Sequence, residues 1–288
     1  PAEVFSGCFV AWVEGLRDGD PEIVAIDGKT SRRAHNRAKG QNPLHLVSAW
    51  ASRQRLVLGQ QACEAKDNEI TTIPALLERL ELTGALVTID AMGCQSKIAA
   101  AIRARGADYL LALKGNWPAL SAEVERFFAD AGAQLERWET VDGDHGRIET
   151  RRHAVSHDIA WLTSDRRFPG EWRFKDLAMI AMVENETARD GKTSIERRFY
   201  LSSARQFAAA VRAHWHVENR LHWVMDVVFH DDLMRLRTAN GPANMAAVRH
   251  MSLNIIRGIN DKASLKVRRK TIGWDDNYLA NALTGNAT

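Results

Sequence analysis

The order of strand and helix signals along the first half of this chain limits its fold more than any other feature. Apolar runs of strand length occur at 23–27, 45–51, 56–60, 85–90 and 109–113. The second and third runs lie either side of Arg53-Gln54, which predicts an antiparallel hairpin after the first strand. Segments whose apolar residues have helical spacing lie between the third and fourth runs and between the fourth and fifth. The order is therefore strand, strand, strand, helix, strand, helix, strand. This order predicts an α/β protein with a mixed sheet flanked by helices.

The first helix signal covers 73–80, where Pro74 suits the first turn and Gly84 lies beyond the end. The second passes through 99–102.

The pattern changes between residues 123 and 200 to β-rich sequence, with strand signals at 149–155, 178–183 and 197–201. A long helix is predicted to follow, from about Phe207 to Phe229. We therefore expect a main domain over 21–288 that is interrupted by an inserted β-rich subdomain at about 119–203.

Two of the apolar strands end in an aspartate, at Asp27 and at Asp90. An apolar strand holds its last carboxylate rigidly at the rim of a sheet and partly out of water, a position that suits a cation ligand. The later helix carries a third carboxylate, Glu218. Three such groups that converge are what a two-metal phosphoryl-transfer site needs, with ions about 3.5–4 Å apart.

The predicted long helix has an apolar face and a polar stripe. Its apolar face consists of Phe207, Val211, Val217, Leu221, Val224 and Val228. His214, Glu218, His222 and Asp226 follow at steps of four residues and share the polar stripe. The histidines either assist Glu218 or form an exposed surface, and we favour the exposed surface. Trp215 and Trp223 either stack on an unpaired base or belong to the core, and we favour the core.

Basic residues are clustered although the formal net charge is only +3. One run, without an acid from Gly28 to Gly40, contains Lys29, Arg32, Arg33, Arg37 and Lys39. A second run contains Lys262, Lys266, Arg268, Arg269 and Lys270. Such runs suit a polyanion such as nucleic acid, and a solvated surface is the alternative.

The remaining features of the sequence bear on location and completeness. Cys8, Cys63 and Cys94 form no CxxC pair, which fits a reducing cytoplasm. No apolar run has the length of a membrane span and no signal peptide opens the chain. Because the chain starts at Pro1 rather than Met, we expect it to be a fragment.

Motifs along nearly the whole chain resemble the DDE transposases of bacterial insertion sequences, within them the H-repeat-associated branch. Their order and spacing carry the resemblance. The motifs are Val24–Thr30, Leu44–Trp50, Asn68–Ile70, Thr88–Gln95, Ala112–Asn116, His145–Arg151, His214-Trp215, Glu218-Asn219, Leu221–Trp223 and Gly273–Leu279.

The resemblance implies a ribonuclease-H-like fold with a β-rich insertion before the last catalytic residue. It implies that Asp27, Asp90 and Glu218 bind two Mg²⁺ or Mn²⁺ ions, hydrolyse a phosphodiester at the element's end and transfer the freed strand to target DNA. Residues 1–20 would be the remnant of a longer N-terminal helical region. DNA would be the partner, with a homodimer in a synaptic complex, in the bacterial cytoplasm and on the nucleoid when bound.

Candidate DNA contacts are Lys29, Arg32, Arg33, Arg37, Lys114, Arg147, His214 and His222. The wider superfamily surrounds its glutamate with a tyrosine, an arginine and a lysine. Val211, His214 and Met225 stand there in this chain, so those roles do not carry over directly.

Two other functions fit part of the sequence. A strand followed by Asp27-Gly28-Lys29-Thr30 loosely resembles haloacid-dehalogenase phosphatases, but these need a second aspartate where Lys29 stands. A non-catalytic DNA-binding relic of a decayed element is the other alternative. The intact set of three carboxylates argues against decay of the site.

Overall fold

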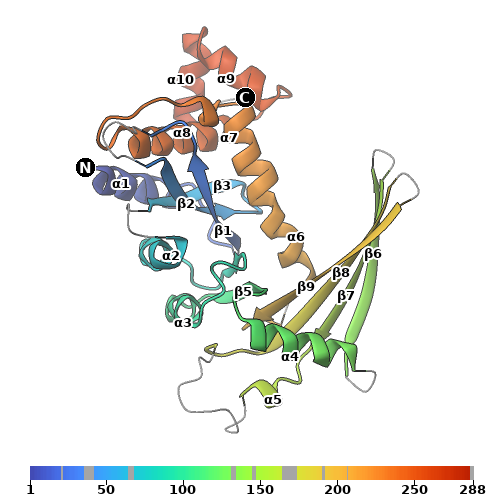
Figure 1. Cartoon of the computed structure of the whole chain (residues 1–288). Helices are drawn as coiled ribbons and strands as arrows, with labels where there is room; N and C mark the ends of the chain where they lie inside the picture. The colour runs from blue at the N-terminus through green and yellow to red at the C-terminus, as the bar shows by residue number, and fades with distance from the viewer. Residues whose placement is uncertain are drawn as a thin grey trace. The chain divides into compact units, whose positions relative to one another are not determined.

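The structure, a computed structural model, describes residues 1–20, 22–35, 42–63, 68–130, 134–144, 147–163, 174–189, 192–205 and 207–285. The chain forms two compact units. Unit 1 consists of Pro1–Glu81 and Ala213–Thr288, and unit 2 of Leu82–Arg212. Each unit contains strands paired into a sheet together with helices, so the α/β prediction is confirmed (Figure 1). Within the described ranges, no helix is both long and apolar enough to cross a lipid bilayer.

Unit 1 is built on an antiparallel sheet in the order β3-β2-β1. Its strands are β1 (Ile23–Ser31), β2 (Leu44–Ala51) and β3 (Leu56–Ala62). Its helices are α1 (Ala2–Glu14), α2 (Glu69–Leu77), α7 (Trp223–Val227), α8 (Gly241–Gly258), α9 (Leu265–Ile272) and α10 (Asp276–Thr284). A short 3₁₀ turn spans Asp231–Leu233. The predicted hairpin after the first strand is confirmed as β2 and β3.

The first strand is longer than predicted. Asp27 pairs with Ser48 in the middle of β1, and pairing with β2 continues as far as Ser31. The prediction that this strand ends at Asp27 is therefore wrong. Gly28 signals a turn locally, but backbone pairing with the first half of β2 keeps residues 28–31 extended.

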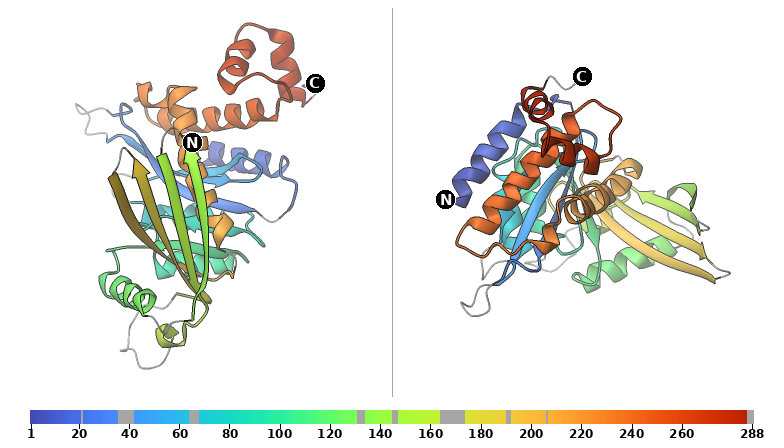
Figure 2. Two further views of the ribbon diagram at one scale, coloured as in Figure 1. Left: turned by 90° about the vertical axis from the view of Figure 1, so that its right-hand side faces the viewer. Right: turned by 90° about the horizontal axis from the view of Figure 1, so that it is seen from above.

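Helices α1 and α8 complete the core of unit 1 (Figure 2). Helix α1 packs against β3 and α8, with Phe9 and Val13 buried. From α8, the Asn254 side chain accepts from the Val57 amide at 2.9 Å and donates to its carbonyl at 3.0 Å. These bonds fasten α8 to the backbone of β3.

Helix α2 begins earlier than predicted. Asn68 caps it by accepting from the Thr71 amide, and Glu69 is its first residue. Pro74 therefore lies inside the helix, and its predicted place in the first turn is wrong. The cap at Asn68 is the start signal that the prediction overlooked.

Unit 2 contains a mixed sheet in the order β4-β5-β9-β8-β7-β6. Strands β4 and β5 are parallel and the other neighbours are antiparallel. The strands are β4 (Leu86–Ile89), β5 (Asp108–Leu113), β6 (Glu136–Asp144), β7 (Arg147–Ser156), β8 (Met179–Arg189) and β9 (Lys192–Ser202). The helices are α3 (Ser96–Ala104), α4 (Pro118–Ala129) and α5 (Ala160–Thr163).

Most strands of unit 2 match the predictions, and β6 is the one that was missed. Its sequence, ERWETVDGD, has little apolar alternation. Strand β9 pairs directly with β5, so the β-rich strands continue the sheet of β4 and β5 (Figure 2). The division of the chain at about 119–203 remains a prediction.

The predicted long helix is a helical segment in three parts. It consists of α6 (Ala208–His216), a π-helical segment (Val217–His222) and α7. Every residue of its predicted apolar face is buried. Trp215 and Trp223 are 44% and 60% exposed, so the prediction that they belong to the core is wrong.

Candidate active site

Asp27 and Glu218 meet in unit 1 although most of the chain separates them in sequence. Asp27 lies on β1, which packs against the π-helical segment that carries Glu218. The two carboxyl groups lie close enough for each to influence the ionisation of the other. The structure thus brings together two of the three carboxylates that the sequence singled out.

The two carboxyls have opposite pKa shifts. Burial raises the pKa of Asp27, but the contact with His222 and the charges of His222 and His214 outweigh burial and hold it below 3.8. The pKa of Glu218 is raised above 4.5, first by partial burial of its carboxyl end and then by the negative charge of Asp27. Asp27 is therefore the carboxyl that loses its proton at lower pH, and Glu218 the one that loses it at higher pH.

His222 holds Asp27 from the same helical segment. Its ring is 7% exposed, and Nε2 lies 3.2 Å from Asp27 Oδ2 as an ion contact rather than a well-directed hydrogen bond. The interpretation of His222 as an exposed surface residue is therefore wrong. Val217 and Leu221 on the same helical segment are buried in unit 1, and the ring of His222 is buried with them.

Lys29 makes further contacts between β1 and the helical segment. Its ammonium donates to the His222 carbonyl at 3.1 Å and forms an ion pair with Asp226. His222 and Asp226 thus contact side chains of β1 directly, whereas Glu218 is exposed next to Asp27.

A second polar cluster lies around Gly28. The Glu69 carboxylate is 2.7 Å from His45 Nε2, and the Thr30 hydroxyl is 2.7 Å from His45 Nδ1. The hydrogen bond to Glu69 raises the pKa of His45 despite its partial burial. A Cβ on Gly28 would come within 2.0 Å of Glu69 Oε1, so only glycine admits this carboxylate. Sequence reasoning assigned no role to His45 or Glu69, although both lie in motifs that carried the family resemblance.

Asp90 lies in unit 2, directly after Ile89 at the end of β4. Its Oδ1 accepts from the amides of Met92, at 3.0 Å, and Gly93, at 3.3 Å. These bonds fix the turn that follows the strand.

The predicted DNA contacts have different surroundings. Arg32 and Arg33 are exposed in the turn after β1, and Lys114 is exposed after β5. His214 is partly exposed on α6. Arg37 lies outside the described residues, and for Arg147 the structure describes only the backbone at the start of β7.

The π-helical segment at Glu218 could not be found from the sequence. Such segments are rare and frequently occur at functional sites. The spacing of the apolar residues from Phe207 to Val228 fits an ordinary α-helix throughout. The i→i+5 turn arises where β1 contacts the helix, which is a tertiary feature.

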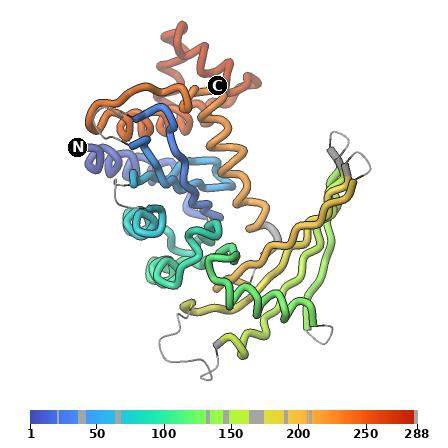
Figure 3. Tube along the Cα trace, viewed as in Figure 1, coloured from blue at the N-terminus to red at the C-terminus, as the bar shows by residue number. Residues whose placement is uncertain are grey.

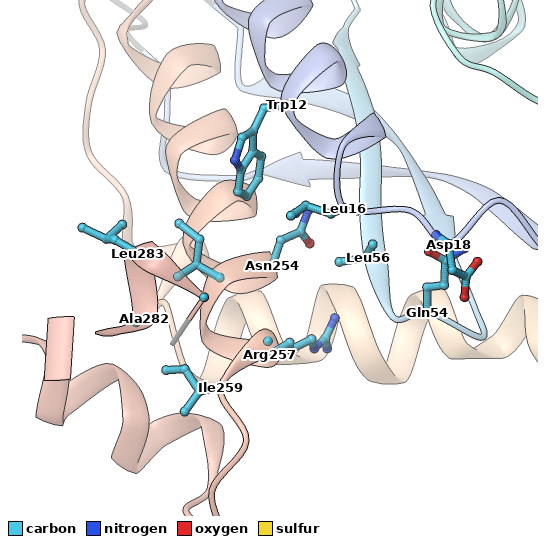
Figure 4. A pocket seen from close by; sticks show the side chains of 13 residues that line it. Trp12, Leu16, Asp18, Gln54, Leu56, Asn254, Arg257, Ile259, Ala282 and Leu283 are labelled. Atoms are coloured by element: carbon cyan, nitrogen blue, oxygen red, sulfur yellow. Dashed lines mark hydrogen bonds between the residues drawn. The ribbon is translucent and has the colours of Figure 1, made fainter. Parts of the chain in front are cut away.

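A separate pocket of about 420 Å³ lies in unit 1 (Figure 4). Trp12, Leu56, Arg257 and Leu283 are among the residues that line it, and they include none of the predicted site residues. In the described part of the chain, no group of three or more His, Cys, Asp or Glu side chains is placed to hold a metal ion. Asp27 and Glu218 form a smaller group, of two potential metal ligands.

Among solved structures, a piggyBac transposase in a synaptic complex with hairpin DNA is similar to this chain with a TM-score of 0.46 and 9% identity. The similarity covers 92% of this chain and 54% of that one. It is too distant to carry an argument about the site.

Sequence comparison gives a closer relationship. Residues 18–255 match the family model described as "Transposase DDE domain". The YncI protein of Escherichia coli O157:H7, named as a candidate transposase, is 37% identical over 97% of this chain and 73% of its own length. The YhhI protein of E. coli strain K12, named as an H repeat-associated candidate transposase, is 36% identical over 98% of this chain and 77% of its own length. The chain therefore belongs to the DDE transposases, and its relatives include H repeat-associated proteins.

Proposed function

We propose that this chain is the catalytic part of a DNA transposase that cuts and joins phosphodiester bonds with divalent cations held by Asp27, Asp90 and Glu218. The observation that carries the proposal is the pair formed by Asp27 and Glu218 in unit 1. A ribonuclease-H-like fold with a β-rich insertion is part of the proposal.

The residues present fit a divalent cation. After burial, the charge of Asp27 is the next largest cause of the raised pKa of Glu218, which means that the two carboxylates repel each other when both are ionised. A cation would relieve that repulsion, and an all-oxygen ligand set suits Mg²⁺ or Mn²⁺. Two bound cations would lower the pKa of a water molecule and stabilise the leaving oxygen.

The remaining side chains of the site keep the carboxylates in place. His222 holds Asp27 on β1, while Lys29 and Asp226 tie β1 to the helical segment. Because burial and the charge of Asp27 raise the pKa of Glu218, protons would compete with a cation for its carboxylate, so cation affinity should rise with pH. Because Lys29 is already paired, Arg32 and Arg33 are better placed than Lys29 to contact DNA phosphates.

The proposed partners are the ends of an insertion sequence and a target DNA, with two copies of the chain in a synaptic complex. The experiment that tests the function is nicking of DNA that carries the cognate element ends. We expect nicking with Mg²⁺ or Mn²⁺, none with EDTA, and loss in Asp27→Asn and Asp90→Asn variants that remain folded. Metal-independent nicking, or full activity in either variant, would overturn the proposal.

A further inference from the structure

The C-terminal basic run divides into two sets of cations with different surroundings. Arg268 donates to Asp261 and to the Ile256 carbonyl. Arg269 donates to the Val228 carbonyl at 2.6 Å and lies over the Phe229 ring. Both arginines fasten α9 to the rest of unit 1.

The lysines of the same run have no such contacts. Lys262, Lys266 and Lys270 are all exposed, and no ion pair or hydrogen bond involves their ammonium groups in the described part of the chain. They follow at steps of four residues, and the next step is Trp274, which is 71% exposed. Lys266 and Lys270 therefore lie on one face of α9, with about 6 Å between them along the helix axis.

Helix α9 itself is almost wholly surface. It belongs to the C-terminal part of the trace, drawn in red tones (Figure 3). None of its residues is buried, and none is acidic. The nearest acids along the chain are Asp261, paired with Arg268 and bonded by Tyr278, and Asp275, which caps α10. Asp276 is exposed in the first turn of α10. Lys266 and Lys270 thus share an exposed face of α9 that contains no acid, and Lys262 is exposed in the bend just before the helix.

We propose that Lys262, Lys266 and Lys270, with Trp274 at the end of the row, form a contact surface for the phosphate backbone of duplex DNA, an inference that rests on DNA being the substrate of the proposed function. Flexible ammonium groups in a row suit phosphates, which attract them without regard to base sequence. Arg269 links this surface to the helical segment of the candidate active site through the Val228 carbonyl.

The test is DNA binding by the full chain as a function of salt, with a duplex of arbitrary sequence and about 30 base pairs as the probe. The variant Lys262→Gln/Lys266→Gln/Lys270→Gln should lower the slope of log K against log[salt] by about 0.9 for each lysine that binds a phosphate in the wild type. At about 0.1 M salt, affinity should fall by about tenfold or more, equally for all sequences.

The control variant is Lys97→Gln/Lys175→Gln/Lys192→Gln, which removes the same charge from exposed sites in unit 2. It should change the slope by much less. Equal slopes for the two triple variants, or an unchanged slope in the α9 variant, would overturn the proposal. Failure of the wild type to nick would instead count against the proposed function.

Discussion

Glu218 lies against the ionised Asp27, and this contact determines how the site should respond to a neutral side chain. Glu218→Gln keeps the size of the side chain at an exposed position, so the fold should be retained. Nicking should fall by at least about a hundredfold, as for the removal of a single electrostatic stabiliser. DNA binding should survive, because a negative charge that faces phosphates has been removed.

Asp226→Asn is the matched control for Glu218, two turns apart on the same helical segment. Its carboxylate is already paired with Lys29, so the variant should keep most of its activity. If Asp226→Asn were inactive and Glu218→Gln active, Asp226 would be the third metal ligand.

His250 on α8 should make the stability of the protein depend on pH. His250 is 4% exposed, its Nδ1 donates to Gln60 Oε1 at 2.7 Å, and burial lowers its pKa from 6.5 to about 3. Below about pH 6.5 this histidine binds a proton in the unfolded chain but not in the folded chain. The contribution of the buried neutral ring to the free energy of unfolding is therefore fully present above pH 6.5 and is lost as the pH falls toward 3.

Urea unfolding of wild type and His250→Gln across this pH range measures the effect. The free energy of unfolding of the wild type should fall more steeply with decreasing pH, by up to about 1.4 kcal/mol per pH unit. Parallel pH profiles for the two proteins would show that His250 is protonated in the folded state.

At the scale of elements, Gly28 lies where β1, β2 and α2 pack together, and only glycine fits there. In Gly28→Ala the new Cβ would displace the Glu69 carboxylate from His45. We expect a decrease of about 1–3 kcal/mol in the free energy of unfolding. In a Glu69→Ala background the same substitution should cost clearly less, because the displaced group is gone.

Gly143→Ala provides a strand-matched control for this prediction. Gly143 lies in β6, and a Cβ there would meet no atom within 4 Å. Its stability should change little. Equal decreases at Gly28 in both backgrounds would show that Glu69 is not the obstacle.

Elements whose signals are local could be predicted from the sequence, and those set by tertiary contacts could not. The strands β4 and β5 and the helix α3 follow from compact apolar runs. The extension of β1 past Asp27 depends on its pairing with β2, and β6 depends on its neighbour β7. The helices α8, α9 and α10 were not predicted.

The same distinction applies to the candidate site. Asp27 and Glu218 were singled out by residue type and position, and the structure pairs them. The burial of His222 and the π-helical turn were not predictable, because both arise where the helical segment meets β1. The pairing of Lys29 with Asp226 has the same origin.

At the scale of the whole molecule, the proposed chemistry requires Asp27 and Glu218 of unit 1 and Asp90 of unit 2 to act on the same metal ions. Directed cleavage of the chain by iron tests this requirement without knowledge of the element ends. Fe²⁺ binds oxygen ligands and can replace Mg²⁺. With ascorbate and peroxide it produces hydroxyl radicals that cut the backbone close to the bound metal.

A shared metal site predicts peptide fragments that end near residues 27, 90 and 218, all suppressed by excess Mg²⁺ and all absent in Asp27→Asn. Mass spectrometry of the fragments gives the cut sites. Cuts near residues 27 and 218 with none near 90, or cuts that Mg²⁺ does not suppress, would contradict the assignment of the three carboxylates to one metal site.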